Sequence, residues 1–179
     1  MESISIFIKV IDKLTSLLQG RVSDKRRLFT EIIEPIFQEL QPVVDDYLRL
    51  FRESHKKIEK SSGNEWTEVV SQIKEHREEL WHARTKIVAF ADAIDENVKD
   101  KRVSLFANKV LRLFCATDEP KDRRMSRSRE LIELLELLDK PELDKGFVMQ
   151  RIKTTENQVK DSWVAIAQSY AQLRIEMMK

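Results

Sequence analysis

The stretch WTEVVSQIKEHREELWHARTKIVAFADAIDENV, residues 66–98, decides the fold. One row of its apolar residues recurs at seven-residue intervals: Trp66, Ile73, Leu80, Ile87 and Ile94. A second row is formed by Val70, Ala91 and Val98, with Arg77 and Arg84 between them. Because seven residues make about two helical turns, the first row is one apolar stripe along a long helix. The pattern predicts an antiparallel bundle contact or a coiled coil.

The remaining chain shows the same helical spacing. Its apolar residues predict helices over 3–19, from Ser23 or Asp24 to about residue 58, over 103–114 and 130–140, and from Pro141 to the C-terminus. KSSGNE at 60–65 predicts a loop, and residues 116–128 predict a polar connection or a frayed helix start. No stretch alternates with a period of two for long enough to form a strand.

Pro35 and Pro42 interrupt the second predicted helix. Each proline lacks a backbone donor and crowds the preceding turn, so we expect a kink or a break near both. The sequence leaves open whether the two prolines bend one helix or separate two.

The composition supports a helical domain. A chain of 179 residues predicts a single domain, residues 1–179, with a sizeable core. Charged residues make up 35% of the chain and glycine only three positions, a mixture that favours long helices. We therefore expect an all-α fold, an elongated, mostly antiparallel helical bundle of about five to six helices. Two of them are expected to be long, at roughly 35 residues or about 50 Å each.

The charge balance and the cysteine count narrow the function classes. The net charge is +1, whereas a dedicated nucleic-acid binder usually has a basic excess. Cys115 is the only cysteine, so an intramolecular disulfide is impossible and a zinc site would need other ligands. We see no signal-peptide pattern and no apolar run long enough for a membrane span. We expect a cytoplasmic protein with no cofactor, no membrane contact and no small-molecule site.

HREELWH, residues 76–82, contains the residues most typical of a reactive site. On a helix, His76 and His82 lie about 120° apart around the axis and about 9 Å apart along it. The histidines of zinc proteases lie at i and i+4, where one ion touches both. His76 and Glu79 flank the apolar stripe. The stretch therefore indicates a solvated flank with ordinary charge pairs, and we expect no metal site.

The same stretch contains a second pattern, R-x4-H, formed by Arg77 and His82. It is similar to the R-x4-6-H motif of HEPN-domain ribonucleases, which are small all-α bundles. The resemblance implies a metal-independent ribonuclease whose Arg and His act at a dimer interface, the His as acid or base and the Arg on phosphate. The residue after the arginine is Glu78, where the family commonly has Asn. Arg49 and His55 give a second match, R-x5-H.

KDRRMSRSR, residues 121–129, is a dense basic run. Four arginines in it could contact nucleic acid or phosphate: Arg123, Arg124, Arg127 and Arg129. Ser126 also has the R-R-x-S context of a basophilic kinase site. The run has no interleaved aromatic residues for base stacking, and acidic residues follow it, so a solvated loop is the commoner explanation.

No pattern in the chain identifies an enzyme, so catalysis is the less favoured class. Our leading hypothesis is a non-enzymatic helical protein that acts through protein–protein contact, as a subunit or adaptor, or through self-association. We predict the contact on the last helix, at Trp163, Tyr170, Leu173 and Met177. The same apolar rows could equally be buried within the monomer. The alternatives are a HEPN-like ribonuclease and a nucleic-acid-binding regulatory protein.

Overall fold

The computed structural model confirms the all-α class. It describes residues 2–19, 24–60, 66–114, 129, 132, 133, 136 and 145–179, without the side chains of 66–70, 73, 77, 79 and 80. The elements are α1 (Glu2–Gln19), α2 (Lys25–Leu28), a π-helical turn η1 (Phe29–Ile33), α3 (Glu34–Lys60), α4 (Trp66–Asn97), α5 (Lys101–Phe114) and α7 (Lys145–Met177). No strand occurs in these described ranges.

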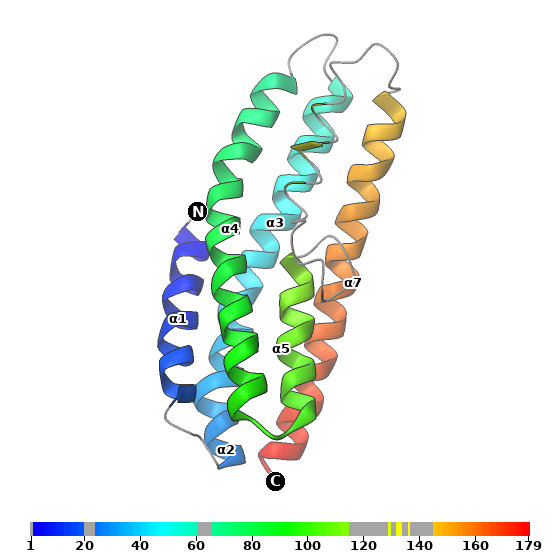
Figure 1. Cartoon of the computed structure of the whole chain (residues 1–179). Helices are drawn as coiled ribbons and strands as arrows, with labels where there is room; N and C mark the ends of the chain where they lie inside the picture. Colours follow the sequence, from blue (N-terminus) through cyan, green and yellow to red (C-terminus); the bar gives the residue numbers. More distant parts are fainter. Residues whose placement is uncertain are drawn as a thin grey trace.

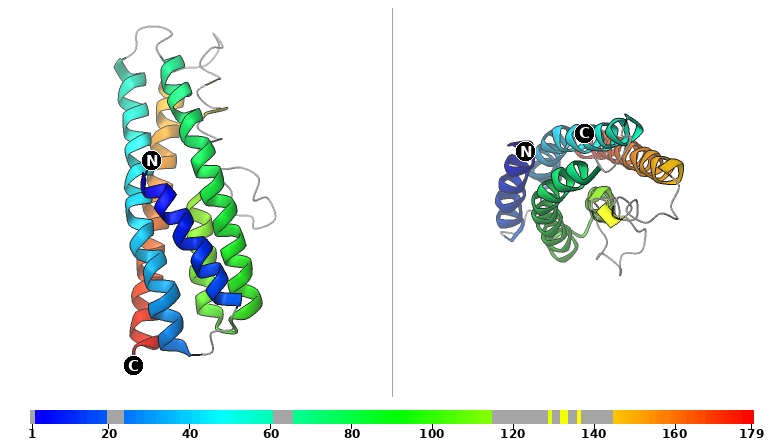
Figure 2. Two further views of the ribbon diagram at one scale, coloured as in Figure 1. Left: turned by 90° about the vertical axis from the view of Figure 1, so that its left-hand side faces the viewer. Right: turned by 90° about the horizontal axis from the view of Figure 1, so that it is seen from above.

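The helices form an elongated antiparallel bundle (Figure 1). Successive long helices run in opposite directions, α3 and α5 one way and α4 and α7 the other. α7 packs against α3 and α5, α4 packs against α5 and α1, and α1 closes the arrangement on α3. The view from above in Figure 2 shows this arrangement end-on. The expected long helices are present: α4 and α7 have 32 and 33 residues, and α2, η1 and α3 together form one helical run from Lys25 to Lys60.

The second predicted helix begins where its capping residue indicated. Asp24 accepts a hydrogen bond from the Arg26 backbone N–H at 2.9 Å and so caps α2. Neither proline ends the helical run. Of the two options that the sequence left open, the prolines therefore lie within one run and do not separate two helices. Just before Pro35 the hydrogen bonding widens to a π turn, with the Glu34 N–H donating to the Phe29 carbonyl. A π turn accommodates the crowding that a proline causes in the preceding turn. Pro42 lies inside α3.

The apolar rows meet in one core. It includes the phenylalanines Phe7, Phe29, Phe51, Phe90, Phe106 and Phe114, all at most 1% exposed. Ile87, Ala91 and Ile94 from the rows of α4 are buried in it, as predicted. Arg84, in the second row, is 6% exposed, with its guanidinium carbon 5.4 Å from the Trp81 ring centroid. The coiled-coil interpretation stays a prediction.

Some predicted features fall outside the described residues. These are the loop at 61–65, Cys115, the connection at 116–128 and the start of the last helix at 141–144. Of the short predicted helix at 130–140, only Ile132, Glu133 and Glu136 are described, and all three are helical. None of the described helices combines the length and apolarity that a bilayer crossing requires.

Candidate interaction surface

Aromatic rings join α3 to α7 along one side of the bundle. The Phe37 ring of α3 lies between two rings of α7, with centroids 3.9 Å from Tyr170 and 5.1 Å from Trp163. The three rings are nearly parallel, at 3° and 12°. All three side chains are half-buried, so the stack reaches the surface. We call Phe37, Trp163 and Tyr170 the aromatic stack.

A polar group accompanies this stack. The Tyr170 hydroxyl donates a hydrogen bond to Glu34 Oε1 at 3.3 Å, which links α7 to the start of α3. Burial, and then the negative charge of Glu34, raise the pKa of Tyr170 above its usual 10.0. The phenol is therefore protonated at neutral pH and acts as a donor.

At the other end of the same helix pair, a buried carboxylate is surrounded by cations. Glu156 of α7 is only 4% exposed. Its oxygens lie 2.6 Å from Lys160 Nζ, 2.9 Å from Lys153 Nζ and 3.4 Å from Arg52 Nε, the last on α3. Burial alone raises the carboxyl pKa, but the hydrogen bonds from Lys160 and Lys153 outweigh it and lower the pKa to about 2. We call these four residues the ion cluster.

The cations of the ion cluster remain accessible to solvent. The Arg52, Lys153 and Lys160 side chains are 55%, 56% and 40% exposed. Three cations around one carboxylate give this end an excess of positive charge. Lys56, which is exposed, follows Arg52 by one helical turn and extends the basic surface along α3.

The outward side of α7 continues from these cations into an apolar row. The row holds Val164, Ala171 and Ile175 of α7 and Met178, the residue directly after α7, all exposed. Val164 is 52%, Ile175 61% and Met178 40% exposed. At 100° per residue, Lys153, Lys160 and these four positions fall within an arc of about 60°. We call these six residues the outer stripe: basic toward the start of α7, apolar toward its end.

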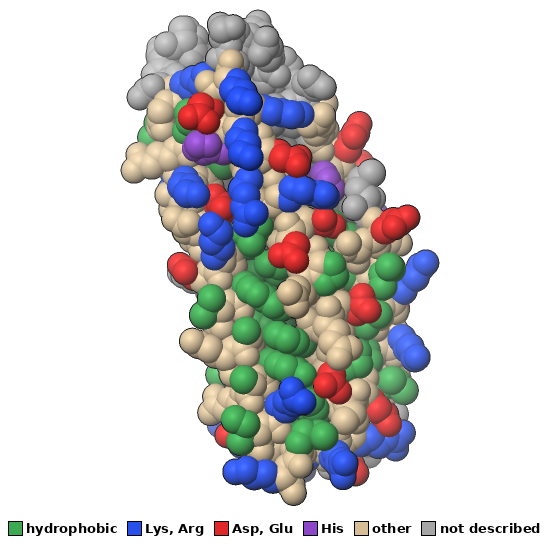
Figure 3. All heavy atoms as spheres, turned by 180° about the vertical axis from the view of Figure 1, so that it is seen from behind, with side chains coloured by type: hydrophobic (Ala, Val, Ile, Leu, Met, Phe, Trp, Pro, Cys, Tyr) green, Lys and Arg blue, Asp and Glu red, His purple; other side chains and the backbone are tan. Residues whose placement is uncertain are grey.

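Figure 3 shows the side on which α3 lies, opposite to the view of Figure 1. Lys and Arg side chains gather over its upper half. Apolar side chains form a patch along the middle and lower part of the same face. Acidic side chains are interspersed in the upper half, and further Lys and Arg side chains lie at the lower end, below the apolar patch.

The structure separates the four predicted contact residues into two groups. Leu173 and Met177 are 2% and 5% exposed and belong to the core. Trp163 and Tyr170 are half-buried in the aromatic stack. The apolar rows named from the sequence are thus largely buried within the monomer, the option that the sequence left open. The contact prediction itself stays a prediction, and Trp163 and Tyr170 are the members that reach the surface.

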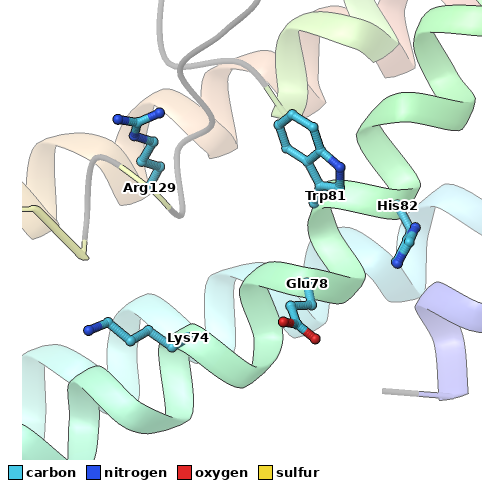
Figure 4. A pocket seen from close by; sticks show the side chains of 5 residues that line it. All are labelled: Lys74, Glu78, Trp81, His82 and Arg129. Atoms are coloured by element: carbon cyan, nitrogen blue, oxygen red, sulfur yellow. The ribbon is translucent and has the colours of Figure 1, made fainter.

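Of the two predicted ribonuclease residues, only His82 has a described side chain, and it lies on another face. His82 is exposed on α4 and lines an open hollow of about 730 Å³ with Lys74, Glu78, Trp81 and Arg129 (Figure 4). In Figure 4, Lys74 and Arg129 lie toward one end of the hollow and His82 toward the other. The Arg77 side chain lies outside the described part, so the structure does not test the Arg77–His82 pair.

Two arginines from the other sequence predictions, one from the R-x5-H match and one from the phosphate prediction, form ion pairs with nearby carboxylates. Arg49 pairs with Asp46 at 3.0 Å, and His55 is half-buried on the same helix. Arg129 pairs with Glu133 at 2.7 Å. The other three predicted phosphate contacts, Arg123, Arg124 and Arg127, lie outside the described residues.

The metal interpretation of residues 76–82 is tested in part. His76 is half-buried, His82 is exposed, and the Glu79 side chain is not among those described. Among the described residues, no group of three His, Cys, Asp or Glu side chains is placed to hold a metal ion.

Sequence reasoning missed the ion cluster and the outer stripe. The signal for the first was K-x2-E-x3-K at 153–160, which places two lysines one turn on either side of Glu156. The signal for the second was a third apolar row at 164, 171, 175 and 178, beside two stronger rows. Phe37 had no comparable signal, because its partners are more than 120 positions away in the chain. The chain matches no known family model, no curated protein and no solved structure.

Proposed function

We propose that this chain is a non-catalytic protein that binds another protein through the outer stripe of α7, as a subunit or adaptor of an assembly. The observation that supports this is the exposed apolar row Val164, Ala171, Ile175 and Met178. Single exposed apolar residues are normal on protein surfaces, but an aligned row is typical of a contact site.

The spacing of the row suits a helical partner. Its members follow one another at intervals of seven, four and three residues. Side chains with this spacing form the ridge that packs into the groove of a facing helix. The aromatic stack lies beside the row and gives it a rigid edge, since each of its rings contacts another.

Site-specific photo-crosslinking tests the proposal. A benzophenone amino acid replaces Val164 or Ile175 in the full chain, which is expressed in its native host and irradiated after nuclease treatment. The matched control replaces Leu105 of α5, which is 54% exposed and lies off α7. We expect the same protein adduct from Val164 and Ile175 and none from Leu105. Adducts that appear equally at Leu105, or at none of the three, would contradict the proposal.

A second candidate function is a HEPN-like ribonuclease, and the observation that favours it is the exposed position of His82. This side chain lies at an open hollow that also holds the cations Lys74 and Arg129. A histidine there could transfer protons to a bound RNA. The two cations pair with Glu136 and Glu133 at 2.7 Å each, so a phosphate would compete with these carboxylates for them.

RNA cleavage by purified protein tests this candidate. His82→Ala is compared with His76→Ala, which removes a half-buried histidine of the same helix. A ribonuclease that uses His82 loses cleavage in the first variant and keeps it in the second. RNA binding without cleavage, with an affinity that falls steeply with salt, would instead support a nucleic-acid-binding regulator.

A further inference from the structure

We infer that the partner segment is an acidic amphipathic helix, whose carboxylates meet the basic part of the outer stripe while its apolar side chains cover the lower part. The inference rests on the proposed function and specifies the partner's chemistry. It follows from the order of side chains along α7: Lys153 and Lys160 first, then Val164, Ala171, Ile175 and Met178.

The cations are held in place for such a contact. Glu156 is buried beneath them and ionised, since its pKa is lowered to about 2. It fixes the Lys153 and Lys160 ammonium groups at 2.9 and 2.6 Å while more than a third of each side chain faces solvent. Cations held in this way lose less side-chain entropy when they bind an anion than free lysines do.

Charge decides against a second copy of this chain as the occupant. If two outer stripes pack in parallel, lysines face lysines. If they pack antiparallel over their full length, the lysines of each copy lie on Ala171, Ile175 and Met178 of the other, where burial of an unpaired charge is costly. A partner with carboxylates at one end and apolar side chains at the other would pair with the lysines of the outer stripe and cover its apolar row.

The aromatic stack argues against nucleic acid as the occupant. Single-stranded nucleic acid binds by stacking its bases on open aromatic faces. Both faces of the Phe37 ring are already covered, by Tyr170 and by Trp163. The row beyond them consists of aliphatic side chains, which offer no hydrogen bonds to base edges.

The stripe also sets the size of the partner segment. It extends from Lys153 to Met178, which at 1.5 Å per residue is about 38 Å. A single partner helix of about 25 residues would cover it. Its carboxylates are expected within the quarter to third of its length that meets Lys153, Lys160 and the neighbouring Lys56.

Designed peptides test the inference with the purified chain. The probes are 25-residue helical peptides with glutamates in one terminal third and leucines at three-four spacing in the remainder, made in both orders along the sequence. Control peptides carry lysine in place of glutamate, and a 25-nucleotide single-stranded RNA serves as a third probe. Binding is measured by fluorescence anisotropy at low and at high salt. We expect one of the two glutamate peptides to bind, more weakly at high salt, and the lysine peptides not to bind.

Charge-neutral variants locate the site. The double variant Lys56→Gln/Lys153→Gln leaves Lys160 and Arg52 on Glu156, so the fold is kept. We expect it to weaken peptide binding about ten-fold at low salt. The matched control Lys9→Gln/Lys13→Gln removes two exposed cations from α1, and we expect less than about a two-fold effect. Ile175→Ser tests the apolar part and should weaken binding at both salt concentrations.

Several outcomes would overturn the inference. Equal effects of the two double variants, preferential binding of the RNA, or a stable dimer that Ile175→Ser dissociates would each do so. The crosslinking experiment distinguishes a failure of the proposed function from a failure of the acidic-partner inference. If Val164 and Ile175 crosslink to a protein with no acidic helix, or binding of that protein survives Lys56→Gln/Lys153→Gln, the proposed function holds and the acidic partner is wrong.

Discussion

The two ends of the contact between α3 and α7 are built from different chemistry. At one end, the aromatic stack presses Phe37 between Tyr170 and Trp163. At the other, the ion cluster joins Arg52 of α3 to Glu156 of α7 through charge. Both ends are partly open to solvent. The stacked rings carry no charge, whereas the second end depends on the ionised carboxylate of Glu156, whose pKa is lowered to about 2.

This difference indicates that the two ends of the helix pair have different roles. Apolar rings pack by area and contact, and they are insensitive to salt. Ion pairs at a surface contribute less to stability, but their charges produce an electrostatic potential that attracts a partner of opposite charge. The stack therefore fixes α7 on α3, and the ion cluster prepares a charged surface. Three substitutions, taken from the largest expected effect to the smallest, can break or sharpen this comparison.

The largest expected effect belongs to Phe37→Ala. It removes the central ring of the stack and leaves a gap between Tyr170 and Trp163. We expect a loss of about 3 kcal/mol in the free energy of unfolding, from lost burial and two lost ring contacts. For a chain of this size, that lowers the melting temperature by about 6–12 °C. Urea denaturation followed by circular dichroism measures it.

The matched control for this change is Phe147→Ala. Phe147 lies on α7 and is 48% exposed. Its removal should cost less than about 1 kcal/mol in the free energy of unfolding, since Phe147 is more exposed than Phe37 and so has less burial to lose. If the two alanine variants are equally destabilised, the stack does not hold α7 on α3, and the comparison between the two ends fails.

The bundle was predictable because its helices repeat their apolar residues at fixed intervals. Ile87, Ala91 and Ile94 are buried as their row requires, and Asp24 caps the helix that it was expected to start. Such patterns are local, so they can be read one helix at a time.

The surfaces were less predictable, because they depend on which helices become neighbours. Phe37 and Tyr170 are brought together by the packing of α7 on α3, which the sequence does not state. Leu173 and Val164 both belong to apolar rows of α7, and only the packing decides that the first is buried and the second exposed. The sequence also left open whether the helix continues through Pro42, and it does, since favourable packing outweighs the cost of one lost hydrogen bond.

An intermediate effect is expected for Glu156→Gln. The glutamine keeps the shape of the side chain but removes the charge that the three cations surround. We expect the free energy of unfolding to fall by about 2 kcal/mol near neutral pH. The loss is smaller than for Phe37→Ala because the freed cations are partly exposed and regain water.

The pH dependence gives this prediction its sharpest test. The pKa of Glu156 in the folded chain is about 2, below its usual 4.5, so the ionised carboxylate stabilises the fold fully above about pH 4.5. That contribution is lost as the pH falls toward about 2. The difference in the free energy of unfolding between the native chain and Glu156→Gln should therefore decrease as the pH falls through this interval. A constant difference from pH 7 to pH 3 would show that the charge of Glu156 does not stabilise the fold.

The smallest expected effect is that of Tyr170→Phe, which keeps the stack and removes only the hydrogen bond to Glu34. At 3.3 Å this bond is long, and we expect its loss to cost about 0.5 kcal/mol near neutral pH. Because the pKa of Tyr170 is raised, the phenol stabilises the fold fully below pH 10.0, and this contribution falls as the pH rises further. The advantage of the native chain over Tyr170→Phe should thus disappear above that pH in paired urea titrations.

Glu34→Gln is the matched control, since it keeps an acceptor but removes the negative charge. NMR titration of the tyrosine ring should show the Tyr170 pKa lower in Glu34→Gln than in the native chain, while burial still holds it above its usual value. An unchanged pKa would mean that burial alone sets the proton on Tyr170, and the polar link between α7 and α3 would then contribute nothing to this end of the contact.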